Sequence, residues 1–199
     1  MSKAMHPMAL ADTANWLSTY LNHPFRIVGT ALGLTKAQGC RTLIVADLGG
    51  LLARSFSCDG FQRVTGQPAC GICKSCLMRR QSIYAGGLSG FDKPEAYISD
   101  ITNPEVVISD HHIHGLRLML DQLSVLDQCL AASDPWRALV DAFPPLLELE
   151  ARAEDWQDVG GPGLPSTTLP SMYAAYVKEW EQFPISPSLR RGIGLGKAA

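Results

Sequence analysis

The chain of 199 residues has no run of about eighteen consecutive apolar residues, the length that a membrane-spanning helix requires. Near its first residues it also lacks the continuous apolar stretch, followed by small residues, that marks a secretory signal peptide. We therefore expect a cytoplasmic protein with no membrane partner, in a reducing compartment where structural disulfides are rare. An apolar fraction of 46% with 18% charged residues excludes a disordered chain.

Three common catalytic motifs are also missing. The sequence contains no G-x-x-x-x-G-K-[ST] phosphate loop, no G-x-S-x-G nucleophile motif and no H-E-x-x-H metalloprotease motif. Glycines follow an aliphatic segment in "DLGGLL", but no lysine accompanies them to hold a nucleotide phosphate. We therefore expect no enzymatic activity of the chain's own.

The net charge is −2, which gives no overall attraction to nucleic acid. Its distribution is uneven. Residues 54–93 carry six Lys and Arg against two Asp, whereas residues 148–158 carry five acids against one Arg. The last sixteen residues contain three cations and no acid. A near-neutral total thus hides a basic region and a basic tail, the pattern that is relevant to polyanion binding.

Hydrophobic patterning predicts an α+β fold, with a small zinc-knuckle α/β N-terminal half and an α-helical C-terminal half. β-branched and aliphatic residues predict a strand pair over 41–57. A second hairpin is predicted over 96–109, around Asn103-Pro104. We divide the chain into a zinc-bearing α+β region (1–108), a helical region (109–183) and a basic extended tail (184–199).

Several helices are predicted with their ends. A short helix covers 76–84, and a long amphipathic helix begins at Ser109 or Asp110 and reaches Leu130. Asp134 can cap another helix that starts with Pro135. Glycine and proline make 159–171 a linker by composition, before a last helix over 172–183.

The stretch "CDGFQRVTGQPACGICKSC" contains four of the six cysteines. Zinc requires four ligands in a tetrahedral array, and a Cys-x2-Cys turn presents two thiolates from one tight knuckle. We predict a structural Zn²⁺ ion on Cys58, Cys70, Cys73 and Cys76. Cys40 can replace Cys58 if the knuckles pair differently. A redox pair and a disulfide set are the competing interpretations of the same cysteines.

Basic side chains surround this cysteine stretch: Arg63, Lys74, Arg79 and Arg80. Four thiolates on one divalent zinc carry a net charge of −2, which these cations partly offset. We predict that the same four residues contact nucleic-acid phosphates. The alternative is a solvated basic surface that only balances the thiolate charge.

A second group of polar residues stands in "SDHHIHG". On a helix, Asp110, His111 and His114 fall at spacings that can present several metal ligands from one face. That arrangement would indicate a metal-dependent nuclease. The competing interpretation is a polar helix start, with Asp110 at the positive end of the helix dipole and the histidines solvated.

The order "HPFRIVGTALGL", then a cysteine near an aliphatic segment, then "SFSCDGF" and "CGICKSC" resembles the small zinc-finger protein of type IV CRISPR effector complexes, the equivalent of their large subunit. The resemblance covers roughly the first 80 residues. It departs from the family at the first knuckle, where Leu43 stands in place of a second cysteine after Cys40. It implies a non-enzymatic RNA-binding and DNA-binding subunit of a ribonucleoprotein complex for antiviral or anti-plasmid defence, in contact with other subunits. Such a subunit reads the target-flanking motif on target DNA and anchors the 5′ end of the guide RNA.

A second resemblance competes with the first. One cysteine before a triple-cysteine run, followed by "VVISDHHIHGLRLML", is similar to the zinc module of bacterial DNA polymerase clamp-loader subunits. Because this chain lacks the phosphate loop, that resemblance implies a clamp-loader-like protein of DNA replication without ATPase activity.

Overall fold

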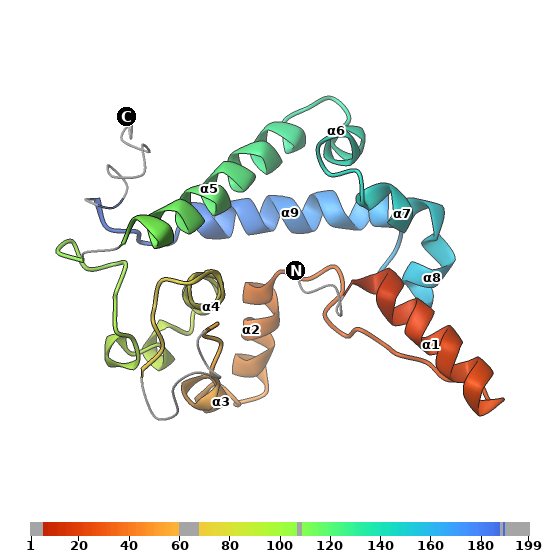
Figure 1. Ribbon diagram of the computed structural model, residues 1–199, viewed down its shortest axis with the longest axis horizontal. Coiled ribbons are helices and arrows are strands. Elements are labelled where there is room, and N and C mark those ends of the chain that lie inside the picture. The colour runs from red at the N-terminus through yellow and green to blue at the C-terminus, as the bar shows by residue number, and fades with distance from the viewer. Residues whose placement is uncertain (1–5, 60–67, 107–108, 188, 190–199) are drawn as a thin grey trace. The chain divides into compact units, whose positions relative to one another are not determined.

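The protein is almost entirely helical in the computed structural model, which describes residues 6–59, 68–106, 109–187 and 189, and only the backbone of 110–112 (Figure 1). In this part of the chain the one β pairing is an isolated parallel bridge between Ala69 and Tyr97. The predicted α+β fold is therefore wrong, and the class is mostly helical.

The bounds of the elements set the frame for the site. In chain order they are α1 (Pro7–Leu21), α2 (Lys36–Val45), α3 (Gly50–Arg54), α4 (Lys74–Ala85), the 3₁₀ turns η2 (Ser89–Phe91) and η3 (Pro94–Ala96), α5 (Asp110–Leu130), α6 (Pro135–Ala142), α7 (Leu146–Ala151), α8 (Ala153–Asp158) and α9 (Pro165–Glu181). None of the described helices has the length and apolar composition needed to cross a membrane.

The strand pair predicted over 41–57 is replaced by α2, a turn and α3. Ala37 and Cys40 lie one helical turn apart and are both buried on the face of α2 that packs against α4. The β-branched end of the run is left outside, and Val45 is 90% exposed. A short apolar run does not distinguish a strand from a helix by periodicity, so packing against α4 decides the outcome.

The hairpin predicted over 96–109 is replaced by η3 and a series of turns as far as residue 106, and residues 107–108 lie outside the described part. Asp100 accepts hydrogen bonds from the backbone N–H and hydroxyl of Thr102, at 2.9 and 2.7 Å. Asn103 accepts one from the N–H of Glu105 at 2.9 Å. Such short side chains satisfy backbone donors locally, in competition with a strand ladder.

The predicted helices are confirmed more often than the strands. Helix α4 covers the short helix after the cysteines, and α5 begins at Asp110. Asp134 caps α6 by accepting a hydrogen bond from the N–H of Arg137 at 3.0 Å. The predicted linker is only partly irregular, because α9 already begins at Pro165 and contains Pro170.

Contacts within the chain divide it into two compact units. Unit 1 consists of residues 1–35 and 125–176, and unit 2 of residues 36–124 and 177–199. Both units are discontinuous, because α5 and α9 each contribute to both. The boundaries predicted after residues 108 and 183 do not coincide with those of the units.

Unit 1 is built around Trp156, which is almost fully buried with Met8, Leu149 and Leu169. Helix α1 packs against α8. Arg152 ties the two helices together, since its guanidinium donates to Asp12 and Asp155, both at 2.6 Å.

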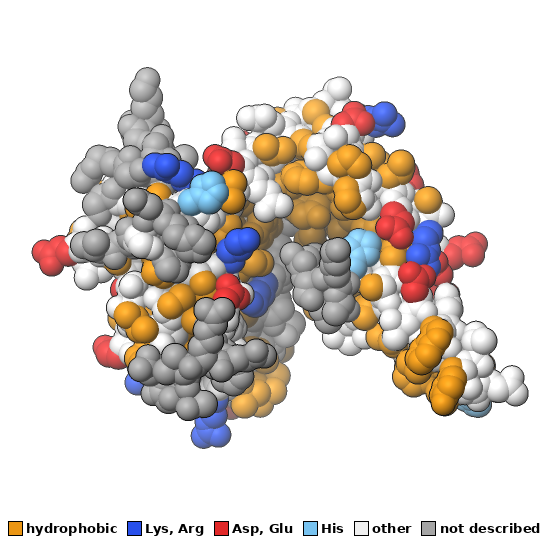
Figure 2. Space-filling view, in the orientation of Figure 1, with side chains coloured by type: hydrophobic (Ala, Val, Ile, Leu, Met, Phe, Trp, Pro, Cys, Tyr) orange, Lys and Arg blue, Asp and Glu red, His pale blue; other side chains and the backbone are white. Residues whose placement is uncertain are grey.

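The C-terminal half of α1 leaves aromatic side chains outside this core. Trp16 and Tyr20 are 64% and 75% exposed, and their rings stack with centroids 5.6 Å apart. Figure 2 shows apolar side chains gathered at this end of α1.

Two core clusters of unit 2 lie around the helix that carries Cys76. The first contains Cys40, Leu52, Ile83 and Leu88, between α2, α3 and α4. The second contains Ala69, Cys76 and Tyr97, and the other three cysteines of the stretch pack against it. The cysteines are thus part of the core of unit 2.

Candidate metal centre

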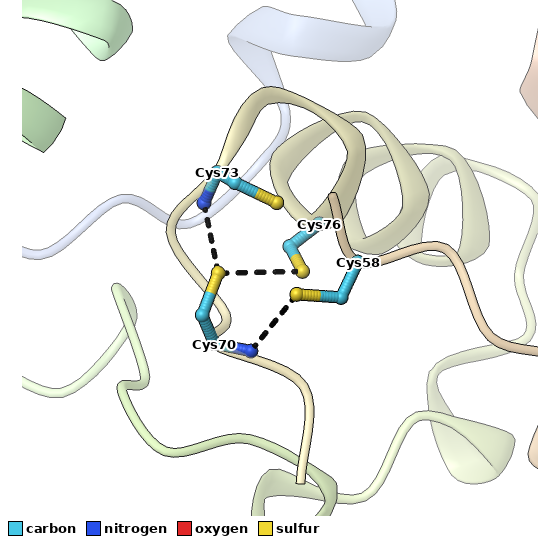
Figure 3. A group of neighbouring side chains, drawn as sticks. All are labelled: Cys58, Cys70, Cys73 and Cys76. Atoms are coloured by element: carbon cyan, nitrogen blue, oxygen red, sulfur yellow. Dashed lines mark hydrogen bonds between the residues drawn. The ribbon is translucent and has the colours of Figure 1, made fainter. Parts of the chain in front are cut away.

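Four cysteines converge at the start of α4, and they come from two segments of unit 2 (Figure 3). Cys58 follows the extended segment after α3. Cys70 and Cys73 stand in the turn before α4, and Cys76 lies in the first turn of the helix. Cys73 is the N-cap residue, with an extended backbone (φ −71°, ψ 162°).

The sulfur atoms have the spacing of a tetrahedral metal site. All four lie within 4.8 Å of one another, and the Sγ atoms of Cys70 and Cys76 are 3.8 Å apart. Zinc–sulfur bonds of about 2.3 Å in a tetrahedron place the sulfurs about 3.8 Å apart. The four side chains can therefore hold one metal ion with small adjustments.

Backbone amides orient three of these sulfurs. The N–H of Cys73 donates to the Sγ of Cys70 at 3.3 Å, and the N–H of Cys70 donates to the Sγ of Cys58 at 3.4 Å. The N–H of Asp59 donates to the Sγ of Cys73 at 3.5 Å. Hydrogen bonds of this kind fix the ligands and stabilise negative charge on sulfur.

Burial works against that negative charge. Desolvation raises the pKa of the Cys73 thiol to about 11, although the Asp59 amide lowers it in part. Desolvation also raises the pKa of Cys76, which is fully buried. Thiolates at this site therefore need a bound cation. Coordination to a cation lowers the pKa of a thiol and deprotonates it.

The competing interpretations of the cysteines fit this geometry less well. Every cysteine in the chain is a free thiol, and 3.8 Å is far beyond the length of a disulfide bond, about 2.05 Å. A redox cysteine requires a lowered pKa, whereas the pKa values of Cys73 and Cys76 are raised. The group is best described as a candidate metal centre.

The remaining two cysteines are outside the site. Cys40 is buried among Leu52, Ile83 and Leu88, so it does not take the place of Cys58 in the group. Cys129 is buried on α5, and its thiol donates to the carbonyl of Ala138 at 3.4 Å.

Two of the four residues predicted to contact nucleic acid, Arg79 and Arg80, form hydrogen bonds within the protein. Arg79 donates to the hydroxyl of Tyr97 at 3.3 Å, to the hydroxyl of Ser55 and to the carbonyl of Leu52. It thereby joins α4 to the end of α3 and to the segment after η3. Its guanidinium supports the fold next to the cysteines.

Arg80 is only 5% exposed and holds a network that sequence reasoning missed. Its guanidinium pairs with Asp92 at 3.3 Å and Asp100 at 2.7 Å, and lies 4.5 Å from the centre of the Tyr97 ring. We call these four residues the Arg80 network. Desolvation raises the pKa of Asp100, but hydrogen bonds from Thr102 and Arg80 outweigh it, so the net shift is downward.

The other two residues predicted to contact nucleic acid are Lys74 and Arg63. Lys74 is exposed at the first position of α4, and its ammonium group has no counter-ion in the described part of the chain. Arg63 lies outside the described residues.

The "SDHHIHG" segment starts α5, which agrees with both of its interpretations. The side chains of Asp110 and His111 lie outside the described part, and His114 is exposed. Among the described residues, the cysteines form the one group of three or more potential ligands close enough to hold a metal.

We expect Gly71→Ala to disrupt the metal centre. Gly71 lies between two ligands with φ +80°, and a Cβ atom there would overlap the carbonyl oxygen of Ser99. The left-handed backbone alone costs about 1–2 kcal/mol for a residue with a side chain, and the overlap adds to that. Chemical denaturation and zinc affinity would measure the effect.

Gly87→Ala is the matched control for this substitution. Its φ is +77°, and a Cβ atom there would meet open space. Equal destabilisation by the two substitutions would show that close packing against Ser99 is unimportant.

No protein-family model, curated protein or solved structure matches the chain.

Proposed function

We propose that the four cysteines bind one structural Zn²⁺ ion and that the chain is a nucleic-acid-binding subunit of an RNA-guided effector complex of the type IV CRISPR kind. The observation that carries the zinc site is the convergence of four thiols, at tetrahedral spacing, at the start of α4. The assignment to an effector complex rests on the resemblance of roughly the first 80 residues to the zinc-finger protein of such complexes. In this role the protein works in the cytoplasm with guide RNA, target DNA and other effector-complex subunits. It reads the target-flanking motif and anchors the 5′ end of the guide RNA.

The donor set favours zinc. Four thiolates in a tetrahedron are typical of zinc and of iron–sulfur sites, and soft ligands exclude magnesium and calcium. A site closed by four protein ligands has no open position for a water molecule or a substrate. The metal therefore serves the fold, and we propose no catalytic role for it.

The nucleic-acid role is supported by exposed cations in the unit that contains the metal centre. Lys74 follows the ligand Cys73 directly, and the exposed Arg54 ends α3 in the same unit. Arg79 and Arg80 bond to residues within unit 2 and are not part of the proposed contact with nucleic acid. Figure 2 shows Lys and Arg side chains scattered over the visible face, with no single dense patch. Few phosphate contacts suffice where guide and target read sequence by base pairing.

We expect Arg54→Gln and Lys74→Gln each to weaken binding of the assembled complex to target DNA. Each lost phosphate contact should reduce the slope of log affinity against log salt by about one unit. Zinc content and stability should be unchanged, since both side chains are exposed. Lys178→Gln, an exposed cation on α9, is the charge-matched control. Unchanged affinity and salt slope in the double variant would remove these two residues from the contact.

The proposal as a whole is tested by co-expression of the chain with its genomic neighbours. A small RNA of defined length should elute with the purified complex. Elution with replication proteins and no RNA would instead favour the clamp-loader interpretation and overturn the proposal.

The absence of catalysis is tested separately. We expect no nuclease or nucleotide hydrolysis with added Mg²⁺, Mn²⁺ or Zn²⁺. Activity that disappears in His111→Ala or His114→Ala would show that "SDHHIHG" is a catalytic centre.

A further inference from the structure

A small cavity lies beside the metal centre, within unit 2. Its volume is about 170 Å³. Two of its walls are the chain segments that lead into the site, since Ser57 and Ala69 line it and each directly precedes a cysteine of the group. A cavity of about 150 Å³ admits a single benzene ring. The cavity therefore has room for one planar ring system and is too small for a drug-sized ligand, whose pockets begin at about 300 Å³.

The walls of the cavity are largely aromatic. Phe56, Phe91 and Tyr97 line it, and they come from three separate turns of the chain. Tyr97 is buried, whereas Phe56 and Phe91 are 44% and 41% exposed. Aromatic side chains of this kind are the usual partners of an unpaired nucleobase, because every base has an aromatic face.

One edge of the cavity is polar and held in place. Arg79 lines it with three of its five N–H groups already bonded to Tyr97, Ser55 and Leu52, which leaves two donors on a fixed guanidinium. Asp92 lines it as well. Its two oxygens accept hydrogen bonds from Tyr97 and Arg80, and each retains a further lone pair. The edge thus offers both donors and acceptors in a fixed arrangement.

The rim of the cavity carries a cation. Lys93 lines it, is exposed, and forms no ion pair with any residue that the structure describes. An anionic group attached to a ring inside the cavity would meet this ammonium.

We propose that this cavity binds one unpaired nucleobase, with the ring between Phe56 and Phe91, its polar edge at Arg79 and Asp92, and its phosphate toward Lys93. A phenyl or aliphatic side chain of a protein partner would fill the same volume but leave the polar edge without a partner. The inference rests on the proposed function, because a subunit that handles single-stranded RNA or DNA supplies such a base.

Calorimetric titration of the zinc-loaded full chain with AMP, GMP, CMP and UMP tests the proposal. At least one of the nucleotides should bind, and ribose 5-phosphate, which lacks the base, should bind at least about tenfold more weakly. The nucleoside without its phosphate should also bind more weakly, and the difference should disappear in Lys93→Gln. Equal binding of ribose 5-phosphate and the nucleotides would overturn the proposal, since it would show a phosphate site alone.

Ring substitutions locate the site. Phe56→Leu and Phe91→Leu keep apolar volume but remove the aromatic face, and each should weaken nucleotide binding about fivefold or more. Zinc content should stay at the wild-type level. Phe25→Leu is the control, because Phe25 is an equally exposed phenylalanine of unit 1. Unchanged affinity in both cavity variants would overturn the proposal even if nucleotides bind elsewhere.

A single-stranded pentanucleotide distinguishes the two sources of the base. Competition between pentanucleotide and free nucleotide, lost in Phe91→Leu, would place a base of the nucleic-acid chain in the cavity. Binding of free nucleotide alone would support the cavity as a nucleotide site and contradict the proposed function. An assembled complex that carries RNA with equal affinity in both ring variants would support the proposed function and overturn this inference.

Discussion

Cys76→Ser should release the metal from the chain and unfold much of unit 2. Cys76 is fully buried in a core cluster of this unit with Ala69 and Tyr97, and the other three cysteines of the group pack against this cluster. Structural zinc sites contribute about 10–16 kcal/mol of binding free energy at neutral pH, as much as the whole stability of a typical domain, about 5–15 kcal/mol. We therefore expect the part of unit 2 that packs around the cysteines to depend on the ion for its fold.

The expected result is a protein without zinc, with a lost or strongly lowered thermal transition and reduced helical circular dichroism. Chelation of the wild-type protein should reproduce it. Cys40→Ala is the matched control, since Cys40 is a buried cysteine of the same unit outside the group. This variant should keep the metal, and its stability should fall only slightly, by the loss of one small core group. Wild-type melting of metal-free Cys76→Ser would contradict a structural role for the ion.

Arg80→Met should destabilise the protein by about 3–5 kcal/mol, because it leaves two largely buried carboxylates without their partner. Arg80 is 6% exposed at its side chain, and its partners Asp92 and Asp100 are 10% and 21% exposed. Breaking such a pair is costly, whereas replacing all the charges together is often close to neutral. The triple variant Arg80→Met, Asp92→Asn, Asp100→Asn should therefore be more stable than Arg80→Met alone.

Chemical denaturation of the single and triple variants measures this difference. Lys74→Met serves as the control on the same helix, because its side chain is exposed, and it should change stability by less than about 0.5 kcal/mol. An Arg80→Met protein as stable as the wild type, with weakened DNA binding, would instead restore Arg80 to the predicted nucleic-acid contact.

The grouping of Cys70, Cys73 and Cys76 was predictable because their spacing is a local property. A Cys-x2-Cys turn presents both sulfurs whatever the rest of the chain does, and Cys76 follows one turn later on α4. The cap of α6 by Asp134 was predictable for the same reason. The strands were not, because a short apolar run such as 43–45 is compatible with a strand or a helix, and the packing of Ala37 and Cys40 against α4 decides the outcome.

The role of Arg80 depends on residues that are distant in sequence. Asp92 and Asp100 are separated from it by a loop whose path the sequence does not specify, so the sequence alone favours a surface position for a basic residue beside the knuckle. One signal was present: Cys76, Arg80 and Ile83 recur at helical spacing, and all three are buried on one face of α4. An arginine on the same helical face as a buried ligand indicates an internal ion pair.

The metal content of the purified full chain tests the central claim most directly. Elemental analysis of protein prepared without chelators should find one zinc per chain in the wild type and in Cys40→Ser, and none in Cys58→Ser. A wild-type protein that carries no zinc, or carries iron in its place, would contradict the account. Equal loss of zinc in Cys40→Ser and Cys58→Ser would contradict the assignment of the four ligands.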